Sequence, residues 1–147
     1  MDREELLRRE DESWSTFAAE VDRVPADRRA TDGVVEGWSV KDLVWHCAYW
    51  AGFCADVLTS LDSPEFVDPF AGHDDAYWDL ENGRVAQDGK SKTWDEVAAS
   101  ADEARRRVRD AFERAPEGDK PGTWFGEETF EHYDEHAAHV REFLGAS

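Results

Sequence analysis

The sequence predicts an all-α protein, specifically a four-helix bundle with a long crossover between its second and third helices. Apolar residues recur at helical spacing in four long segments, whereas no segment alternates apolar and polar residues as a strand would. The connection over residues 62–75 is too long for a tight turn between antiparallel neighbours. At 147 residues, the chain is expected to form a single bundle domain over residues 1–147.

The first two helices are separated by a polar connection over residues 26–37. The first is expected over residues 2–24, where an apolar stripe ends before Pro25. The second is expected over residues 40–61, with Ser39 as its N-cap and Asp42 as the capping-box acid. Because it is apolar on nearly every side, it should be the most buried element.

The second half of the chain contains the crossover and two further main helices. A short helix is expected over residues 75–85, ending near Gly89. Thr93 and Glu96 form a capping box that opens a helix reaching about Ala115. Residues 116–122 are expected to be a loop, and the last helix should begin between residues 125 and 128 and end by Leu144.

Charge and apolar content restrict the expected partners and compartment. The net charge of -18 argues against nucleic acid and anionic membrane surfaces as partners. No apolar run approaches the roughly 20 residues needed to cross a bilayer, and the N-terminus lacks a secretion signal, so a cytoplasmic location is expected. Cys47 and Cys54, seven apart on one helix, are too distant for a disulfide and are expected to be buried apolar residues.

Three of the five histidines lie within eight residues of the last helix. His132 and His136 are four apart, so both imidazoles should leave the same helical face. His46, in the apolar second helix, could supply a third nitrogen. Such a three-histidine group suits Zn, Ni or Fe, and its open coordination positions are typical of a catalytic site.

Each of these histidines also has a plainer interpretation. His46 could be a core residue, and His132 and His136 could be solvated on an acidic helix. His139 could replace His132 in the pair, because it is three residues after His136. His73, in the crossover, is expected at the surface.

Residues close to the histidines in sequence are candidates for supporting roles. Tyr49 and Trp50, one turn after His46, could line a pocket with His139, or could be ordinary core aromatics. Asp42 and Glu128 precede His46 and His132 by one turn and could accept an imidazole N–H, although acids are abundant on these helices.

Two motifs resemble the DinB superfamily. Residues 37–46, Gly-Trp-Ser-Val-Lys-Asp-Leu-Val-Trp-His, are similar to its second-helix signature, and residues 129–136 resemble its closing H-x-x-x-H helix. Tyr133 and the run Glu135-His136-Ala137 resemble the ClbS/DfsB-like branch.

The resemblance implies a DinB/YfiT-like bundle with an up-up-down-down course. It also implies a metal triad on His46, His132 and His136, usually with Zn or Ni. Relatives of this kind include thiol-dependent transferases and isomerases that use bacillithiol, mycothiol or glutathione. The ClbS-like branch includes a protein that hydrolyses an electrophilic genotoxin.

The leading functional hypothesis is therefore a metal-dependent detoxification or stress enzyme, either a hydrolase or a thiol S-transferase. Its divalent metal would activate water or a low-molecular-weight thiol against a small electrophile. Two alternatives remain: a non-catalytic module that binds or sequesters a small molecule, and a stress-associated homodimer. Surplus aromatics such as Trp14 and Trp94 motivate the dimer.

Overall fold

A computed structural model describes residues 2–146, and its regular elements are helices. An isolated bridge between Val35 and Trp38 is the β-type pairing found in this part of the chain. The all-α prediction is confirmed. The helices are α1 (Arg3–Asp22), a 3-10 turn (Ala26–Arg28), α2 (Val40–Ser60), α3 (Asp75–Lys90), α4 (Trp94–Arg114), α5 (Asp119–Glu128) and α6 (Phe130–Gly145).

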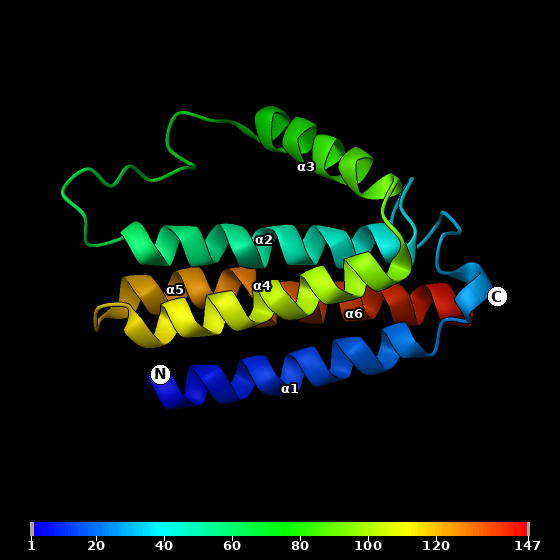
Figure 1. The fold of residues 1–147 in the computed structure, drawn as a ribbon, viewed down its shortest axis with the longest axis horizontal. Coiled ribbons are helices and arrows are strands. Elements are labelled where there is room, and N and C mark those ends of the chain that lie inside the picture. Colours follow the sequence, from blue (N-terminus) through cyan, green and yellow to red (C-terminus); the bar gives the residue numbers. More distant parts are fainter. Residues whose placement is uncertain (1, 147) are drawn as a thin grey trace.

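The bundle is made of α1, α2, α4 and the pair α5–α6, while α3 lies across the outside of α2 (Figure 1). In Figure 1, α1 and α5–α6 run in one direction, and α2 and α4 run in the other. The course is therefore up-down-down-up, and the up-up-down-down course implied by the resemblance is wrong. The connection between α1 and α2 reverses the chain, whereas the long crossover carries it back so that α4 runs parallel to α2.

Local signals account for the starts of the main helices. Ser39 Oγ accepts the backbone N–H of Asp42 at 3.1 Å, and an Asp42 carboxylate oxygen accepts the N–H of Ser39 at 2.9 Å. Thr93 and Glu96 form the same reciprocal pair at the start of α4. Both predicted capping boxes are confirmed, and each fixes the residue at which its helix, α2 or α4, begins.

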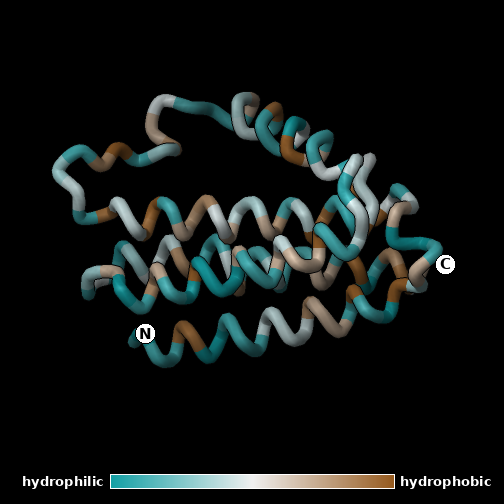
Figure 2. The backbone as a smooth tube through the Cα atoms, in the orientation of Figure 1, coloured by the Kyte–Doolittle hydropathy of each residue, from teal (hydrophilic) through white to brown (hydrophobic). Residues whose placement is uncertain are grey.

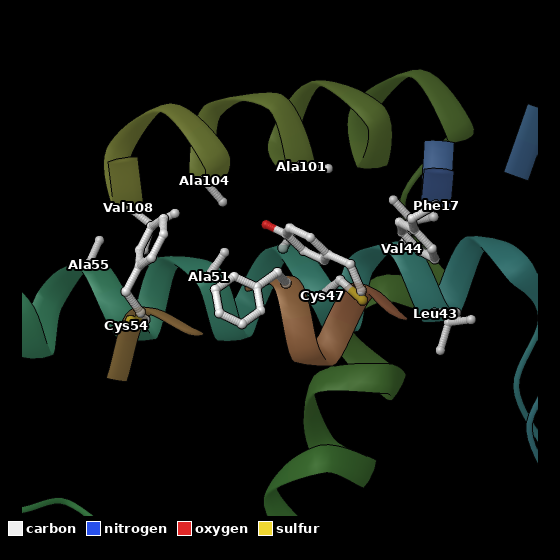
Figure 3. Close-up of a cluster of buried hydrophobic side chains, with 14 of the residues drawn as sticks. Phe17, Leu43, Val44, Cys47, Ala51, Cys54, Ala55, Ala101, Ala104 and Val108 are labelled. Carbon is white, nitrogen blue, oxygen red and sulfur yellow. The ribbon is translucent and has the colours of Figure 1, made fainter. Parts of the chain in front are cut away.

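The most buried helix is α2, as its composition predicts. Val40, Leu43 and Cys54 expose none of their surface. Figure 2 shows the α2 tube as mostly white to brown, whereas α4 carries long teal stretches. Small residues let the two helices approach closely; those visible in Figure 3 are Ala51 and Ala55 of α2 and Ala101 and Ala104 of α4.

The structure corrects two predicted boundaries. The helix after α4 begins at Asp119, so most of the predicted loop over residues 116–122 is helical. Pro121 lies in its first turn, where a missing N–H costs nothing because those amides have no helical partner. The helix then breaks at Thr129, which separates α5 from α6 and whose hydroxyl donates to the Phe125 carbonyl at 2.6 Å.

The helix in the crossover, α3, continues past residue 85 and ends at Lys90, close to the predicted end near Gly89. Its last turns are held against α2: the Trp45 indole N–H donates to the Val85 carbonyl at 3.0 Å. Gly89 lies so close to Trp45 that an added Cβ would approach the indole to 2.4 Å. Among residues 2–146, no helix is long and apolar enough to cross a membrane.

Candidate metal centre

The imidazoles of His46, His132 and His136 converge between α2 and α6. Nε2 of His132 lies 3.0 Å from Nε2 of His46 and 2.9 Å from Nε2 of His136. One ligand nitrogen from each ring lies within 4.8 Å of the other two, so the group could hold a metal ion. The predicted meeting of His46 on α2 with His132 and His136 on the last helix, α6, is what the structure shows.

The histidines are held in place by both local and tertiary structure. His132 and His136 share a face of α6 because they are four apart, and their ring centroids are 4.5 Å apart. His46 reaches them from α2 and is 6% exposed, as is His136. Trp38, just before α2, packs on His46 with ring centroids 4.7 Å apart. The cluster is therefore shielded from solvent on the Trp38 side.

Burial keeps the three imidazoles neutral. Burial, with a smaller contribution from the neighbouring imidazoles, lowers the pKa of His46, His132 and His136 to about 3 each. At neutral pH each ring therefore carries a single proton and one free lone pair. Neutral imidazole is the form of histidine that binds a metal ion.

Two of the three nitrogen–nitrogen separations are close to those around a small divalent metal, and the third is within 4.8 Å. A tetrahedral ion about 2.0–2.1 Å from each nitrogen separates the nitrogens by roughly 3.3 Å. The two Nε2–Nε2 distances of 3.0 and 2.9 Å need only a few tenths of an ångström of expansion to reach that value. The donor set of three imidazoles suits Zn, Ni or Fe.

The outer nitrogens of the three rings differ in their partners. Nδ1 of His136 lies 3.0 Å from Nδ1 of His139. Nδ1 of His46 and Nδ1 of His132 are buried and have no hydrogen-bond partner among the described residues. His139 thus contacts the nitrogen of His136 that faces away from the cluster. The pair on the last helix is therefore His132 and His136, and His139 does not replace His132 in it.

The two carboxylates predicted to support the histidines lie in different surroundings. Asp42 is 1% exposed, and its Oδ2 accepts from the Ser39 backbone N–H at 2.9 Å and from Lys90 Nζ at 2.5 Å. Its Oδ1 is buried without a partner among residues 2–146. Burial, with a smaller contribution from the nearby charge of Glu127, raises the pKa of Glu128 to about 7. Its support of His132 remains a prediction.

The predicted pocket aromatics point in different directions. Trp50 is 6% exposed, and its indole N–H donates to Asn82 of α3 at 2.9 Å. Tyr49 instead lines a hollow of about 580 Å³ between α2 and α4, and none of the three histidines lines that hollow. Trp50 is therefore hydrogen-bonded to α3, and Tyr49 lines the hollow beside α4.

Sequence reasoning missed an aromatic cluster that joins the crossover and α3 to the bundle. In this cluster the centroid of each ring lies within about 6 Å of the centroid of at least one other ring. The members are Trp50, Phe53, Phe70, Trp78 and Trp124. The Trp78 indole N–H is buried and has no partner among the described residues. The aromatic residues in the crossover were the available signal for this cluster. The Lys90–Asp42 pair had no comparable signal, because it joins residues 48 apart.

Comparison with known proteins establishes the family. The model of the DinB superfamily matches residues 2–142, so the chain belongs to that superfamily. An uncharacterised protein from Escherichia coli UTI89 has a similar structure, with a TM-score of 0.78, 18% identity and coverage of 98% of this chain and 93% of its own. No curated protein matches this chain.

A second similar structure is the colibactin self-resistance protein ClbS in complex with a dsDNA. It has a TM-score of 0.81 and 14% identity, covering 97% of this chain and 94% of its own. The exclusion of nucleic acid on the basis of net charge is therefore wrong, since a protein with this fold has been crystallised with dsDNA. Net charge sums the whole surface, whereas nucleic acid contacts only a part of it.

Proposed function

We propose that this member of the DinB superfamily binds a divalent transition metal, Zn or Ni, through Nε2 of His46, His132 and His136. In this proposal the site acts on a small electrophile. The observation that carries the proposal is the convergence of three neutral, buried imidazole nitrogens from two helices. When bound, the metal supplies Lewis acidity and lowers the pKa of a water or low-molecular-weight thiol.

The residues of the chain have separate tasks in this proposal. The three histidines hold the ion with open positions for a reactant. Trp38 keeps bulk water from His46 on one side. Glu128, one turn before His132 in sequence, has a pKa raised to about 7 and so is suited to take up or release a proton near neutral pH.

The proposed reaction class is hydrolysis or thiol transfer in detoxification. Its support is the catalytic character of an incomplete three-nitrogen donor set, together with the structural likeness to a protein named for self-resistance to colibactin. At 14% identity this likeness shows the fold alone, so the substrate must be found by experiment.

Metal analysis is the first test. Untagged protein purified without chelator is expected to contain near-stoichiometric Zn or Ni, and His136→Ala is expected to lose it. His73→Ala is the matched control, because His73 is exposed and stacks on Tyr77. If neither preparation binds metal even with excess Zn or Ni, the proposal is overturned.

Activity is the second test. Metal-loaded wild type and His136→Ala would be compared against panels of epoxide, cyclopropane and halide electrophiles, with and without glutathione, bacillithiol or mycothiol. Turnover that requires both metal and His136 supports an enzyme. A dsDNA arm belongs in the panel because ClbS was crystallised with dsDNA.

A non-catalytic binding role is the second candidate. It is favoured by the aromatic cluster, whose buried Trp78 N–H has no partner among the described residues and could donate to a planar ligand. Saturable binding of an aromatic probe that quenches tryptophan fluorescence, without turnover in any panel, would favour this role. A Trp78→Phe variant that binds the probe equally well would count against it.

A further inference from the structure

We infer that a hollow between α1 and α4 binds a small organic cation of the alkylammonium class. None of the three candidate metal ligands lines this hollow, so the inference is independent of the proposed function. The hollow brings together Trp14 and Trp94, the two tryptophans that motivated the homodimer hypothesis.

The hollow is small and mostly apolar, with a volume of about 170 Å³. Three of the residues that line it are buried, namely Phe17 of α1, Val44 of α2 and Ala101 of α4, and all three are labelled in Figure 3. The half-buried side chains of Trp14 and Trp94 line it from α1 and α4. Since an apolar cavity of about 150 Å³ holds benzene, this hollow has room for a ligand of similar size.

Both ionisable residues that line the hollow are acidic. They are Asp22, at the end of α1, and Asp102 of α4, and both are exposed. No ion pair or side-chain hydrogen bond joins either carboxylate to another residue within residues 2–146. The guanidinium groups that pack over the two tryptophan rings belong to Arg105 and Arg29, and neither of these residues lines the hollow. The hollow therefore combines apolar walls with negative charge that has no countercharge.

This combination favours an organic cation over other occupants. Tryptophan is the aromatic residue that attracts cations most strongly, and an alkylammonium ion can contact it through its alkyl groups while its charge is neutralised by Asp22 and Asp102. A metal ion is less suited, because it needs several polar ligands and most of the lining residues here are apolar. A second copy of the chain would need to bury about 800 Å² on each partner, which a hollow of this size does not supply.

The test is NMR of ¹⁵N-labelled protein titrated with tetramethylammonium chloride. The indole N–H signals of Trp14 and Trp94 are expected to shift saturably, and an equal concentration of sodium chloride should leave them nearly unchanged. Equal shifts with the two salts would overturn the inference. Shifts that depend on protein concentration without any ligand would identify a second copy as the occupant and would also overturn it.

A pair of ligands of the same shape separates charge from apolar contact. Choline is expected to bind about 10-fold more tightly than its uncharged carbon analogue, 3,3-dimethylbutan-1-ol. Equal affinities would show that the hollow takes apolar ligands without regard to charge, which contradicts the inference. No arm of this test involves a metal, so its failure would leave the proposed function standing.

Two aspartate variants locate the site. Asp102→Asn removes a carboxylate that lines the hollow and is expected to weaken tetramethylammonium binding several-fold. Asp110→Asn is the matched control, because Asp110 is an exposed aspartate further along α4 that does not line the hollow. The two variants change the net charge equally, so equal affinities would overturn the inference.

A tryptophan variant tests the ring. Trp94→Leu keeps an apolar side chain but removes the aromatic face, and it is expected to weaken tetramethylammonium binding about 10-fold. Circular dichroism of each variant establishes that it is folded. Unchanged affinity in folded Trp94→Leu would show that the ring does not hold the cation, against the inference.

Discussion

Two buried polar clusters lie on different sides of this bundle, and their hydrogen bonding differs. The ion cluster consists of Glu10 of α1 with Arg105 and Arg109 of α4. Glu10 is 0% exposed, and its carboxylate accepts from Arg105 at 2.7 and 2.8 Å and from Arg109 at 2.7 Å. The histidine cluster, His46, His132 and His136, leaves two Nδ1 atoms without partners among the described residues.

The difference separates a structural role from a binding role. A buried charge whose partners are all present joins two helices and needs nothing further. The Nε2 atoms of the three histidines contact one another, and two of their Nδ1 atoms have no partner among the described residues, so the proposed metal would complete this cluster. The ion cluster should therefore govern stability alone, whereas the histidine cluster should respond to metal and pH.

Removing the charge of the ion cluster should have the largest effect. Glu10→Gln leaves two arginines without their buried partner, and we expect a loss of about 3 kcal/mol in the free energy of unfolding. Urea denaturation measures it. Glu12→Gln is the control, since Glu12 is exposed and pairs with Arg8. Unchanged metal content in folded Glu10→Gln would support the separation of the two clusters. A loss of less than about 1 kcal/mol in the free energy of unfolding would contradict the structural role of the ion cluster.

Metal binding at the histidine cluster should raise the free energy of unfolding by about as much as Glu10→Gln lowers it. Zn or Ni at a hundredfold excess over its Kd should raise the free energy of unfolding by about 2.7 kcal/mol, because the ion binds the folded chain. Thermal or urea unfolding with and without metal gives the value. His136→Ala should show no such gain, whereas Glu10→Gln should show the full gain. A gain that persists in His136→Ala would mean that the metal binds elsewhere.

Acid should destabilise the metal-free chain through the histidine cluster. Burial places the pKa of each histidine at about 3, against 6.5 in the unfolded chain. Between these values the unfolded state binds more protons, so stability is present above pH 6.5 and is lost as the pH falls. The loss is about 1.4 kcal/mol per pH unit for each histidine. The free energy of unfolding of wild type should fall more steeply between pH 6.5 and 5 than that of His132→Gln, by this amount per pH unit. Urea denaturation at each pH measures it, and equal slopes for the two proteins would refute the prediction.

Ionisation of Glu128 should change stability with the opposite dependence on pH. Burial raises its pKa from 4.5 to about 7, so the folded chain retains a proton that the unfolded chain has lost. Stability due to Glu128 is therefore lost as the pH rises from 4.5 to 7. Glu128→Gln should be about 3 kcal/mol more stable than wild type at pH 8 and equal to it at pH 4. Glu127→Gln, at an exposed neighbour, is the control.

Local sequence patterns predicted the positions of most helices well and the arrangement of the helices in the bundle poorly. The capping boxes at Ser39 and Thr93 depend on residues three apart, so they could be recognised directly. The start of α5 could not, because Pro121 is compatible with either a loop or a first helical turn. The direction of the bundle depends on the path of the crossover, which helical spacing does not specify.

The same division holds within the candidate site. The sequence by itself determined that His132 and His136 share a face, that α2 is buried and that His46 lies within it, because these properties follow from helical periodicity and composition. The folded structure was needed to show that His46 meets the other two, that Tyr49 lines a hollow beside α4, and that Lys90 reaches Asp42. The physical reason is that contacts between helices depend on how each helix is rotated and placed against its neighbours, and packing of the whole core determines that.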